Sequence, residues 1–506
     1  MTSGQQLRLY NSLGRRLEDF SPCSARGEEP RGGEPRGGEH CVGLYTCGPT
    51  VYSYQHLGNM RPYVFSDTLR RALAWKGLRV RQIVNITDVG HAVADSDTGE
   101  DKLEVAAARE RRSVADIADF YARDYLAAMA ALNVRPADAY PRASEYVPQM
   151  IDFAKRLEEK GFTYRLPSGL YFDTSQSPGY GALARLDLEG QIEGARVEHV
   201  AGRRHKSDFA LWRAEEPGVR RVMRWDSPWG WGAPGWHLEC SVMSMALLGD
   251  HFDIHTGGID HRQLHHVNEI AQSEAYLDDG KPWVRYWLHN EFITLDAGKI
   301  SKSAGHTLRI ATLAESGYHP LAYRLFLLGG HYRSQLDFTT TAIDAAQATL
   351  RRLVTRVAPL RPLPPVSSLA EALAAGPDGD QAARSYVEKL DAAISADLAT
   401  PTILATLQDA LRDTSLTEAG LRVVVAAADA LLGLRLCDLS VREVEGRRSA
   451  SSLPADEVSR IEALVAERTQ ARKEKNWSRA DEIRDELAEL GVQVTDTGDG
   501  PVWELR

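Results

Sequence analysis

The chain has 506 residues, of which 43% are apolar and 26% are charged, and its formal net charge is −10. This length exceeds what one hydrophobic core usually serves, so we expect about two to four domains. The acidic balance argues against a protein coated all over by nucleic acid, although a local basic face remains compatible with it. No run approaches the roughly 20 apolar residues of a membrane helix, and the N-terminus lacks the apolar core of a secretory signal. We therefore expect a cytoplasmic protein.

The N-terminal segment, residues 1–40, contains the repetitive stretch RGEEPRGGEPRGGE at 26–39. Glycine, proline and charge leave this stretch nothing to bury, so we predict a disordered or solvated insertion. The next elements are predicted as strand, turn, helix, strand and helix, an order that indicates a parallel sheet. Their expected ranges are 41–47 for the first strand, 58–76 for the first helix, 80–87 for the second strand and 103–131 for the second helix.

Further along, a helix at 145–160 opens a mixed region that extends to about 235. The next predicted elements are a strand at 251–258, a helix at 265–277 and a strand at 287–295. From about residue 343 the pattern becomes amphipathic helix, interrupted by a proline-rich linker at 358–368. Residues 455–490 predict two helices broken near Asn476, and a hairpin around Gly-Asp-Gly follows.

The five cysteines are few, odd in number and widely spaced, which does not suit a disulfide framework. Five reduced core thiols are the simplest interpretation, and a metal site that recruits two of them is the alternative. The cysteines are Cys23, Cys41, Cys47, Cys240 and Cys437.

The first candidate motif is HLGN, His56–Asn59, which follows the strand and turn YTCGPTVYSYQ and opens a helix. The N–H groups at a helix N-terminus suit phosphate, and a glycine lets a nucleotide approach the backbone. His56 and Asn59 can both donate hydrogen bonds to phosphate oxygens. Taken alone, four residues of this kind also fit an ordinary capping loop.

The second candidate motif is KISKS, Lys299–Ser303, in a glycine-flanked loop after a strand. Lys299 and Lys302, with two hydroxyl groups, suit a loop that clamps a leaving pyrophosphate as negative charge develops. A solvated basic loop explains the same residues if they are considered alone.

The third constellation has the residue types of a metal site. Cys47 ends the first strand, and Cys240 lies in PGWHLEC. His265 and Glu269 are four residues apart on one predicted helix, so they share a face. Two thiolates, an imidazole and a carboxylate form a plausible tetrahedral zinc set. A metal there would favour a substrate thiol over a hydroxyl, because sulfur is the softer and more acidic donor.

HLGN and KISKS, in this order and about 240 residues apart, resemble the signature pair of class I aminoacyl-tRNA synthetases. The segment HTGGID at 255–260 resembles the stretch that receives adenosine in that class. The resemblance implies an ATP site formed by the following residues: His56, Asn59, His255, Gly257, Gly258, Asp260 and Lys302. It implies catalytic roles for His56, Asn59, Lys299 and Lys302, with Asp260 placed towards the ribose hydroxyls.

The resemblance narrows to the cysteinyl-tRNA synthetase family through YTCGPTVY, NITDVGH, PGWHLECS and HFDIHTGGIDHRQLHHVNEIAQSEA. It implies one zinc ion per chain, held by Cys47, Cys240, His265 and Glu269. It implies a cysteine pocket formed by Cys47, Gly48, Thr50 and Trp236. The partners implied are ATP with Mg²⁺, L-cysteine and tRNA(Cys), and the state expected is a monomer with no membrane contact.

The same resemblance implies the domain organisation. A Rossmann-type α/β catalytic domain is expected at 41–290, with an inserted connective region around 145–235. The KISKS loop and a stem-contact region are expected at 291–342, a helical bundle at 343–445 and an anticodon-binding module at 455–506.

The chain also departs from the family pattern. Asn59 stands where many class I enzymes have histidine, Ile300 replaces methionine, and the GRRHKSDFALW run and the 26–39 insertion are unusual. Two alternatives to a tRNA ligase remain open: a cysteine ligase that acts on a small amine, and a non-catalytic tRNA-binding paralogue. The long tail at 343–506 favours tRNA as the acceptor, and the intact motifs favour catalysis.

Overall fold

The structure, a computed structural model, describes residues 4–23, 41–89, 101–185, 202–215, 218, 221–296, 308–450, 455–497 and 500–505. The insertion predicted at 26–39 and the KISKS segment lie outside these described residues. Among the helices described, none is long and apolar enough to cross a membrane.

A parallel sheet of four strands forms the centre of the front half, in the order β10–β9–β3–β4. All of its neighbouring pairs are parallel, and every residue of β9 is buried. This matches the rule that parallel sheets are covered on both faces and carry nearly continuous apolar runs. The strands are β3 (Cys41–Thr46), β4 (Arg79–Val84), β9 (Phe252–Gly258) and β10 (Val284–Asn290).

The two faces of this sheet belong to two separate cores. Successive side chains on β3 point to opposite faces, so Leu44 joins one core and Tyr45 the other. The core on the Leu44 face includes α1 (Arg61–Trp75), whereas the core on the Tyr45 face includes α5 (Trp236–Leu248) and α6 (His265–Leu277). The sheet therefore has the doubly covered, Rossmann-type arrangement that the sequence predicts.

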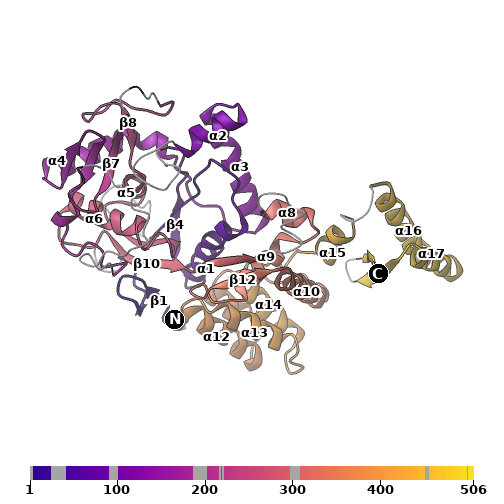
Figure 1. The fold of residues 1–506 in the computed structure, drawn as a ribbon. Coiled ribbons are helices and arrows are strands. Elements are labelled where there is room, and N and C mark those ends of the chain that lie inside the picture. Colours follow the sequence, from indigo (N-terminus) through magenta and orange to yellow (C-terminus); the bar gives the residue numbers. More distant parts are fainter. Residues whose placement is uncertain are drawn as a thin grey trace.

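An antiparallel sheet in the order β5–β6–β7–β8 is inserted between α4 (Val147–Glu159) and α5. It falls within the expected connective region and lies at one end of the molecule (Figure 1). Its strands are β5 (Thr163–Leu166), β6 (Gly169–Phe172), β7 (Phe209–Ala214) and β8 (Gly232–Pro234).

Two expected elements are each divided in the structure. The helix predicted at 103–131 is two helices, α2 (Lys102–Glu110) and α3 (Val114–Ala131), because Arg111 is left-handed and the Ser113 side chain caps α3. The strand predicted at 287–295 is also two strands. Its second part, β11 (Ile293–Asp296), leaves the central sheet and pairs with β12 (Leu336–Thr339).

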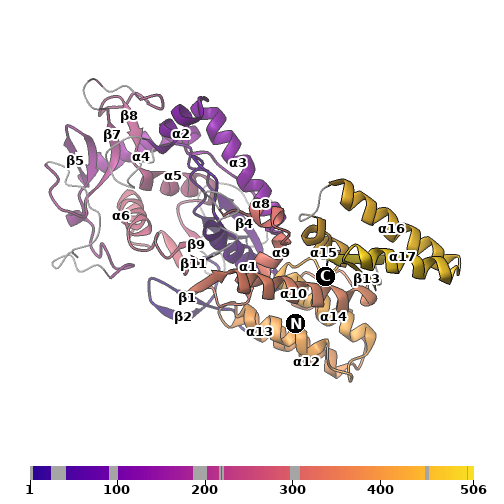
Figure 2. The same ribbon diagram turned by 45° about the vertical axis from the view of Figure 1, so that its right-hand side comes forward.

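The rear half is helical from α8 to α15, and Figure 2 shows these helices between the parallel sheet and the C-terminal helix pair. The N-terminal hairpin of β1 (Arg8–Asn11) and β2 (Arg16–Asp19) lies beside the sheet edge at β10. The helices are α8 (Ile310–Glu315), α9 (Pro320–Leu328), α10 (Thr340–Val357), α11 (Leu369–Ala375), α12 (Gln381–Ser395), α13 (Thr400–Ala410), α14 (Glu418–Leu432) and α15 (Val441–Ala450).

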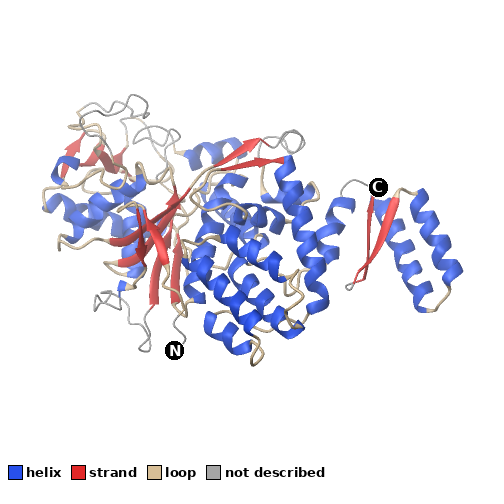
Figure 3. Cartoon of the chain, turned by 90° about the horizontal axis from the view of Figure 1, so that it is seen from below, coloured by secondary structure: helices blue, strands red, loops and turns tan. Residues whose placement is uncertain are grey.

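The C-terminal module has a small core of its own, built from residues such as Ile461, Ile483 and Trp503. Asn476 caps its second helix by accepting from the backbone N–H of Arg479, which confirms the break predicted there. Figure 3 shows the module at the end of the molecule opposite the antiparallel sheet. Its elements are α16 (Ala455–Lys473), α17 (Trp477–Glu489), β13 (Val492–Thr497) and β14 (Gly500–Leu505).

A buried charge network joins the sheet side to the helical bundle. Asp67 on α1 accepts from Arg71 Nε at 2.7 Å and from Arg324 Nη2 at 2.5 Å. Arg324 also donates to the carbonyls of Leu132 and Leu432, so one guanidinium contacts three elements. Burial opposes the ionisation of Asp67, but the charges of Arg324 and Arg71 prevail and hold its pKa well below the usual range.

Asp67→Asn is expected to destabilise the protein by ~3–5 kcal/mol, because it removes the charge that compensates two buried guanidinium groups. Since the pKa of Asp67 is lowered on folding, its contribution is present above about pH 4 and is lost as the pH falls towards the folded value. Thermal unfolding at neutral pH should show a clearly lower midpoint. The control is Glu418→Gln, which removes an exposed pair with Arg422 and should change stability by less than about 0.5 kcal/mol. Equal shifts in the two variants would contradict this assignment.

Candidate metal centre and nucleotide site

Cys47 follows β3 directly and is buried at the carboxyl edge of the central sheet. Its backbone N–H donates to the carbonyl of Thr256 on β9, at 3.1 Å. The next residue, Gly48, has no room for a side chain, since a Cβ there would lie 1.6 Å from the carbonyl oxygen of Asn85. The Gly48 N–H donates to Asn85 Oδ1 at 2.8 Å. This close turn holds the Cys47 thiol in the space beyond the strands.

Cys240 reaches the same space from α5, which packs against α6 through a buried polar contact. Gln272 on α6 donates to Ser241 Oγ at 2.7 Å and to the carbonyl of His237 at 2.6 Å. These bonds help to hold the two helices together, because buried polar groups need hydrogen-bond partners. They place Cys240, on the first turns of α5, opposite the start of α6.

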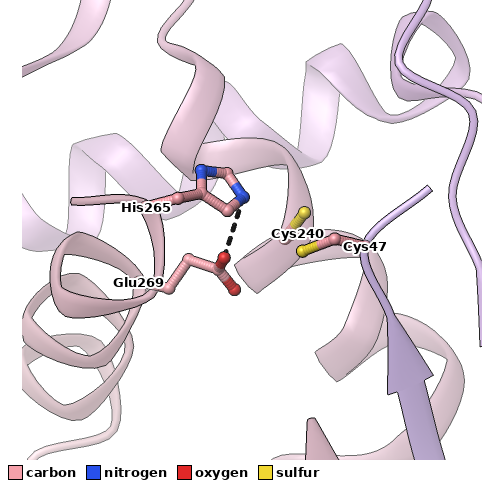
Figure 4. A group of neighbouring side chains, drawn as sticks. All are labelled: Cys47, Cys240, His265 and Glu269. Carbon is pink, nitrogen blue, oxygen red and sulfur yellow. Dashed lines mark ion pairs between the residues drawn. The ribbon is translucent and has the colours of Figure 1, made fainter. Parts of the chain in front are cut away.

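His265 and Glu269 lie one turn apart on α6 and both point towards the two thiols (Figure 4). His265 Nε2 is 2.9 Å from Glu269 Oε1. One ligand atom from each of Cys47, Cys240, His265 and Glu269 can be chosen so that all four lie within 4.8 Å of one another. All four residues are buried. The structure therefore brings together the four residues that the sequence nominated as a metal set.

The ionisable groups in this space affect one another strongly. Burial opposes the ionisation of Glu269, but the neighbouring His255 and His265 prevail and lower its pKa to about 2. Burial likewise opposes protonation of His265, yet Glu269 raises its pKa to about 10. The carboxylate is thus ionised at neutral pH. A metal ion that binds there competes with the proton on His265, so binding releases protons.

The donor set fits a divalent metal. Two sulfur atoms, one imidazole nitrogen and one carboxylate oxygen match the ligand types and the number of a tetrahedral site. Glu269 Oε1 is buried and, among the described residues, accepts no hydrogen bond of good geometry. The cation that offsets its desolvation here is the protonated His265, 2.9 Å away, and a metal ion bound to this oxygen would take that place.

A second set of four donors, Cys47, His255, His266 and Glu269, is also close enough to hold an ion. In this set His255 Nε2 is already bonded to Glu269 Oε2, at 2.9 Å. The other oxygen, Oε1, lies 2.9 Å from His265 of the first set and 3.9 Å from His266 of the second. The first set leaves the bond between His255 and Glu269 intact, so it is the stronger candidate for a metal centre.

A layer of histidines surrounds the centre, and sequence reasoning did not assign it. His237 Nδ1 lies 2.9 Å from His265 Nδ1, and His266 Nε2 lies 3.2 Å from the Cys47 sulfur. His266 Nδ1 meets His289 Nε2 at 2.8 Å. Burial and the neighbouring imidazoles lower the pKa of His266 well below its usual value. The many histidines in HFDIHTGGIDHRQLHH could have indicated this layer from the sequence. The layer also includes His237 on α5 and His289 on β10, which lie outside that run.

His255 is placed differently from the expectation of an ATP contact. It is fully buried and its Nε2 bonds Glu269, so its side chain faces the metal centre. Trp236, expected to close the cysteine pocket, is half-buried and stacks on His265 with ring centroids 4.3 Å apart. Thr50 forms a backbone bridge with Thr87 beyond the ends of the central strands.

The HLGN segment forms a short turn of 3-10 helix, η2 (Leu57–Met60), that leads into α1. Asn59 Oδ1 accepts from the backbone N–H of His56 at 3.0 Å. This bond commits the amide oxygen of Asn59 to the turn, so its two Nδ2 hydrogens are its remaining donors. His56 itself is exposed.

The glycines of HTGGID end β9 at the same edge of the sheet. A Cβ on Gly257 would lie 2.8 Å from the His266 ring, and one on Gly258 would lie 2.3 Å from Asp260 Oδ1. Asp260 is exposed beyond the strand. Open parallel sheets bind their ligands outside the carboxyl ends of the strands, which is where these residues and Cys47 meet. Lys299 and Lys302 lie outside the described residues, so their placement remains a prediction.

Two family models match the chain. Residues 35–348 match the model described as tRNA synthetases class I (C) catalytic domain. Residues 455–503 match the model described as cysteinyl-tRNA ligase anticodon binding domain. The first match alone covers more than half of the chain.

The chain is also similar to curated proteins along its length. A cysteine–tRNA ligase of Novosphingobium aromaticivorans is 47% identical, with 99% of this chain and 97% of the relative covered. One of Zymomonas mobilis is 43% identical, with 98% and 97% covered. This chain belongs to the cysteine–tRNA ligase family, and it is an enzyme of the class I aminoacyl-tRNA synthetases.

A solved structure of Mycobacterium tuberculosis methionyl-tRNA synthetase in complex with methionyl-adenylate is similar in fold. Its TM-score is 0.51 at 15% sequence identity, and the match covers 80% of this chain and 92% of that one. At this identity the likeness concerns the fold, and it agrees with the parallel sheet and helical rear half described above.

His255→Ala is expected to lower metal affinity by about 10- to 100-fold, because it removes the partner that orients Glu269. Metal content after dialysis against a graded chelator is the measurement. The control is His251→Ala, which should leave the metal affinity unchanged. The His251 ring contacts Asp279 and precedes β9, at the end of the strand away from the metal site. An unaltered affinity in His255→Ala would show that this histidine does not support the centre.

Proposed function

We propose that this chain joins L-cysteine to tRNA(Cys) with ATP, in two steps. In the first step the cysteine carboxylate attacks the α-phosphorus of ATP, which gives cysteinyl-adenylate and releases pyrophosphate. In the second step a hydroxyl of the terminal ribose of tRNA attacks the carbonyl carbon, and AMP leaves. The single observation that carries the proposal is the buried set of two thiols, one imidazole and one carboxylate beside the HLGN and HTGGID segments.

The metal in this proposal is zinc, one ion per chain. Two cysteine sulfurs favour a soft or borderline ion, and a histidine and a carboxylate complete a typical zinc set. Zinc bound there supplies a Lewis acid that favours the thiolate of cysteine over the hydroxyl of serine. Trp236, half-buried against His265, is the wall that closes on the substrate side chain. Gly48 and Thr50 belong to the same pocket, since they continue the turn after Cys47.

The nucleotide is proposed to lie along the carboxyl edge of the sheet. His56 and the Nδ2 group of Asn59 donate to its phosphates, and Asp260 accepts from the ribose hydroxyls. The backbone at Gly257 and Gly258 allows close approach of the adenosine. Lys299 and Lys302 are proposed to bind the leaving pyrophosphate, with Mg²⁺ accompanying ATP. Catalysis then rests on positioning and electrostatics, with no side chain as nucleophile.

His255 takes a supporting part in this proposal. Its bond to Glu269 orients the carboxylate towards the metal. The nucleotide is then contacted by the backbone of the glycines that follow His255 in HTGGID. The proposal also places the protein in the cytoplasm and makes it a monomer.

The acceptor is tRNA in this proposal. The helices from α10 to α15 and the module at 455–505 follow the front half, and the module matches the anticodon-binding family model. A cysteine ligase that acts on a small amine has no use for such a module. A non-catalytic paralogue has no need of an intact four-residue metal set.

Two assays on the purified full chain test the proposal. ATP–pyrophosphate exchange should depend on cysteine, and radiolabelled cysteine should then be transferred to a tRNA(Cys) transcript. Transfer to a small amine such as glucosamine, in the absence of transfer to tRNA, would contradict the assignment of the acceptor. An absence of exchange would contradict the assignment of catalysis.

Cys240→Ala is expected to lose zinc and to lower the preference for cysteine over serine on the order of a hundredfold, because a thiolate ligand is missing. Zinc content by atomic absorption and exchange with each amino acid measure the two effects. The matched control is Cys437→Ala, since Cys437 is exposed in the helical half. If Cys240→Ala kept both its zinc and its selectivity, the metal would not be the element that recognises cysteine.

A further inference from the structure

Arg61 is the first residue of α1 and stands two positions after the HLGN motif. It is only 3% exposed, although an arginine this deeply buried is normally paired with a carboxylate. Among the described residues, its guanidinium donates instead to four backbone carbonyls. Burial lowers the pKa of Arg61 to about 10, so the group is still charged at neutral pH.

The four bonds divide evenly between two segments of the chain. Nη1 donates to the carbonyls of Glu291 at 2.9 Å and Phe292 at 2.5 Å, in the link between β10 and β11. Nη2 donates to the carbonyls of His331 at 3.1 Å and Ser334 at 2.5 Å, in the turn between α9 and β12. The planar guanidinium of arginine has several N–H donors and can bind carbonyls of both segments at once, whereas the ammonium of lysine is a compact charge.

These segments form the base of β11 and β12. Ile293 is opposite Leu336 in that pair; Ile293 directly follows Phe292, and Leu336 lies two positions after Ser334. The strand β11 ends at Asp296, and the chain then continues through 297–307, which contains KISKS in sequence. Arg61 therefore fixes the point at which the strand leading to that segment leaves the central sheet.

The HLGN turn also binds the residue that follows 297–307. The N–H of Leu57 donates to the carbonyl of Leu308 at 2.9 Å. The carbonyl of Leu57 accepts from Tyr323 Oη, on α9, at 2.8 Å. These bonds connect backbone groups of six residues around one short stretch of chain: Leu57, Glu291, Phe292, Leu308, His331 and Ser334.

We infer that Arg61 is a positioning residue for the reaction with ATP, acting through the backbone carbonyls of 291–292 and 331–334. It sets the HLGN turn at a fixed distance from the base of β11, and it does not itself touch a substrate. The inference rests on the proposed role of HLGN in binding the ATP phosphates. The metal centre lies against the opposite core of the sheet, so binding of cysteine does not depend on Arg61.

The test is Arg61→Lys in cysteine-dependent ATP–pyrophosphate exchange with the full chain. A displacement of about 1 Å between reacting groups can lower a rate on the order of a hundredfold. We expect kcat/KM for ATP to fall by roughly 10- to 100-fold, with KM for cysteine and the metal content unchanged. The matched control is Arg70→Lys, on the same helix, since Arg70 contacts Asp138, Gln82 and the carbonyl of Pro136 and none of the carbonyls that Arg61 binds. This control should keep the ATP parameters of the parent protein.

Unchanged kcat/KM for ATP in Arg61→Lys, or an equal rise in KM for cysteine and ATP, would overturn the inference. Arg61→Gln, which donates to fewer carbonyls, serves as a second variant and should show the larger loss. If neither variant folds with the metal content of the parent, Arg61 is required for folding and the inference is again overturned. His56→Ala distinguishes a failure of the Arg61 inference from a failure of the proposed role of HLGN. If His56→Ala leaves KM and kcat for ATP unchanged, HLGN does not act on the ATP phosphates, and the inference about Arg61 loses its premise.

Discussion

A buried carboxylate must be compensated, and Glu269 is the group on which the front half of this enzyme depends. It is fully buried, ionised, and bonded through one oxygen to His255. The other oxygen faces His265 and two thiols without a good hydrogen bond from the described residues. The desolvation of such a group costs several kcal/mol unless a cation lies beside it. The protonated His265 lies beside that oxygen, and a metal ion shared with Cys47 and Cys240 would offset the same cost in its place.

The two faces of the central sheet support different parts of the candidate site, and these parts meet at the carboxyl edge of the sheet. The Tyr45 face supports α5 and α6, which carry Cys240, His265 and Glu269. The Leu44 face supports α1, which follows the HLGN turn. Cys47 and the glycines after β9 lie where the two sides meet, at the carboxyl ends of the strands. The reacting carboxylate of cysteine and the α-phosphate of ATP are brought together there in the proposed reaction.

Much of this arrangement was predictable because it follows from residue patterns within short segments of the sequence. The parallel sheet follows from strand–helix alternation, and the i, i+4 spacing of His265 and Glu269 fixes their common face on α6. The family resemblance then selected Cys47 and Cys240 from five cysteines, a choice that spacing alone left open. The break before α17 was predictable because Asn476 is a capping residue that contacts its own helix.

Other features depend on contacts between distant segments, which no local pattern reports. The strand expected at 287–295 divides at Glu291 and Phe292, whose carbonyls accept hydrogen bonds from Arg61, more than 200 residues away in sequence. The side chain of His255 contacts Glu269 on α6, although its motif suggested the nucleotide. Lys299 and Lys302 remain predictions, since they lie outside the described residues.

X-ray absorption at the zinc edge tests most directly whether the metal recognises the substrate thiol. With zinc bound and no amino acid present, the spectrum should fit two sulfur ligands, from Cys47 and Cys240, together with lighter nitrogen or oxygen ligands. Addition of L-cysteine should increase the sulfur count by one, and addition of L-serine should leave it unchanged. A sulfur count that does not change with cysteine would contradict a metal centre that selects its substrate by binding sulfur.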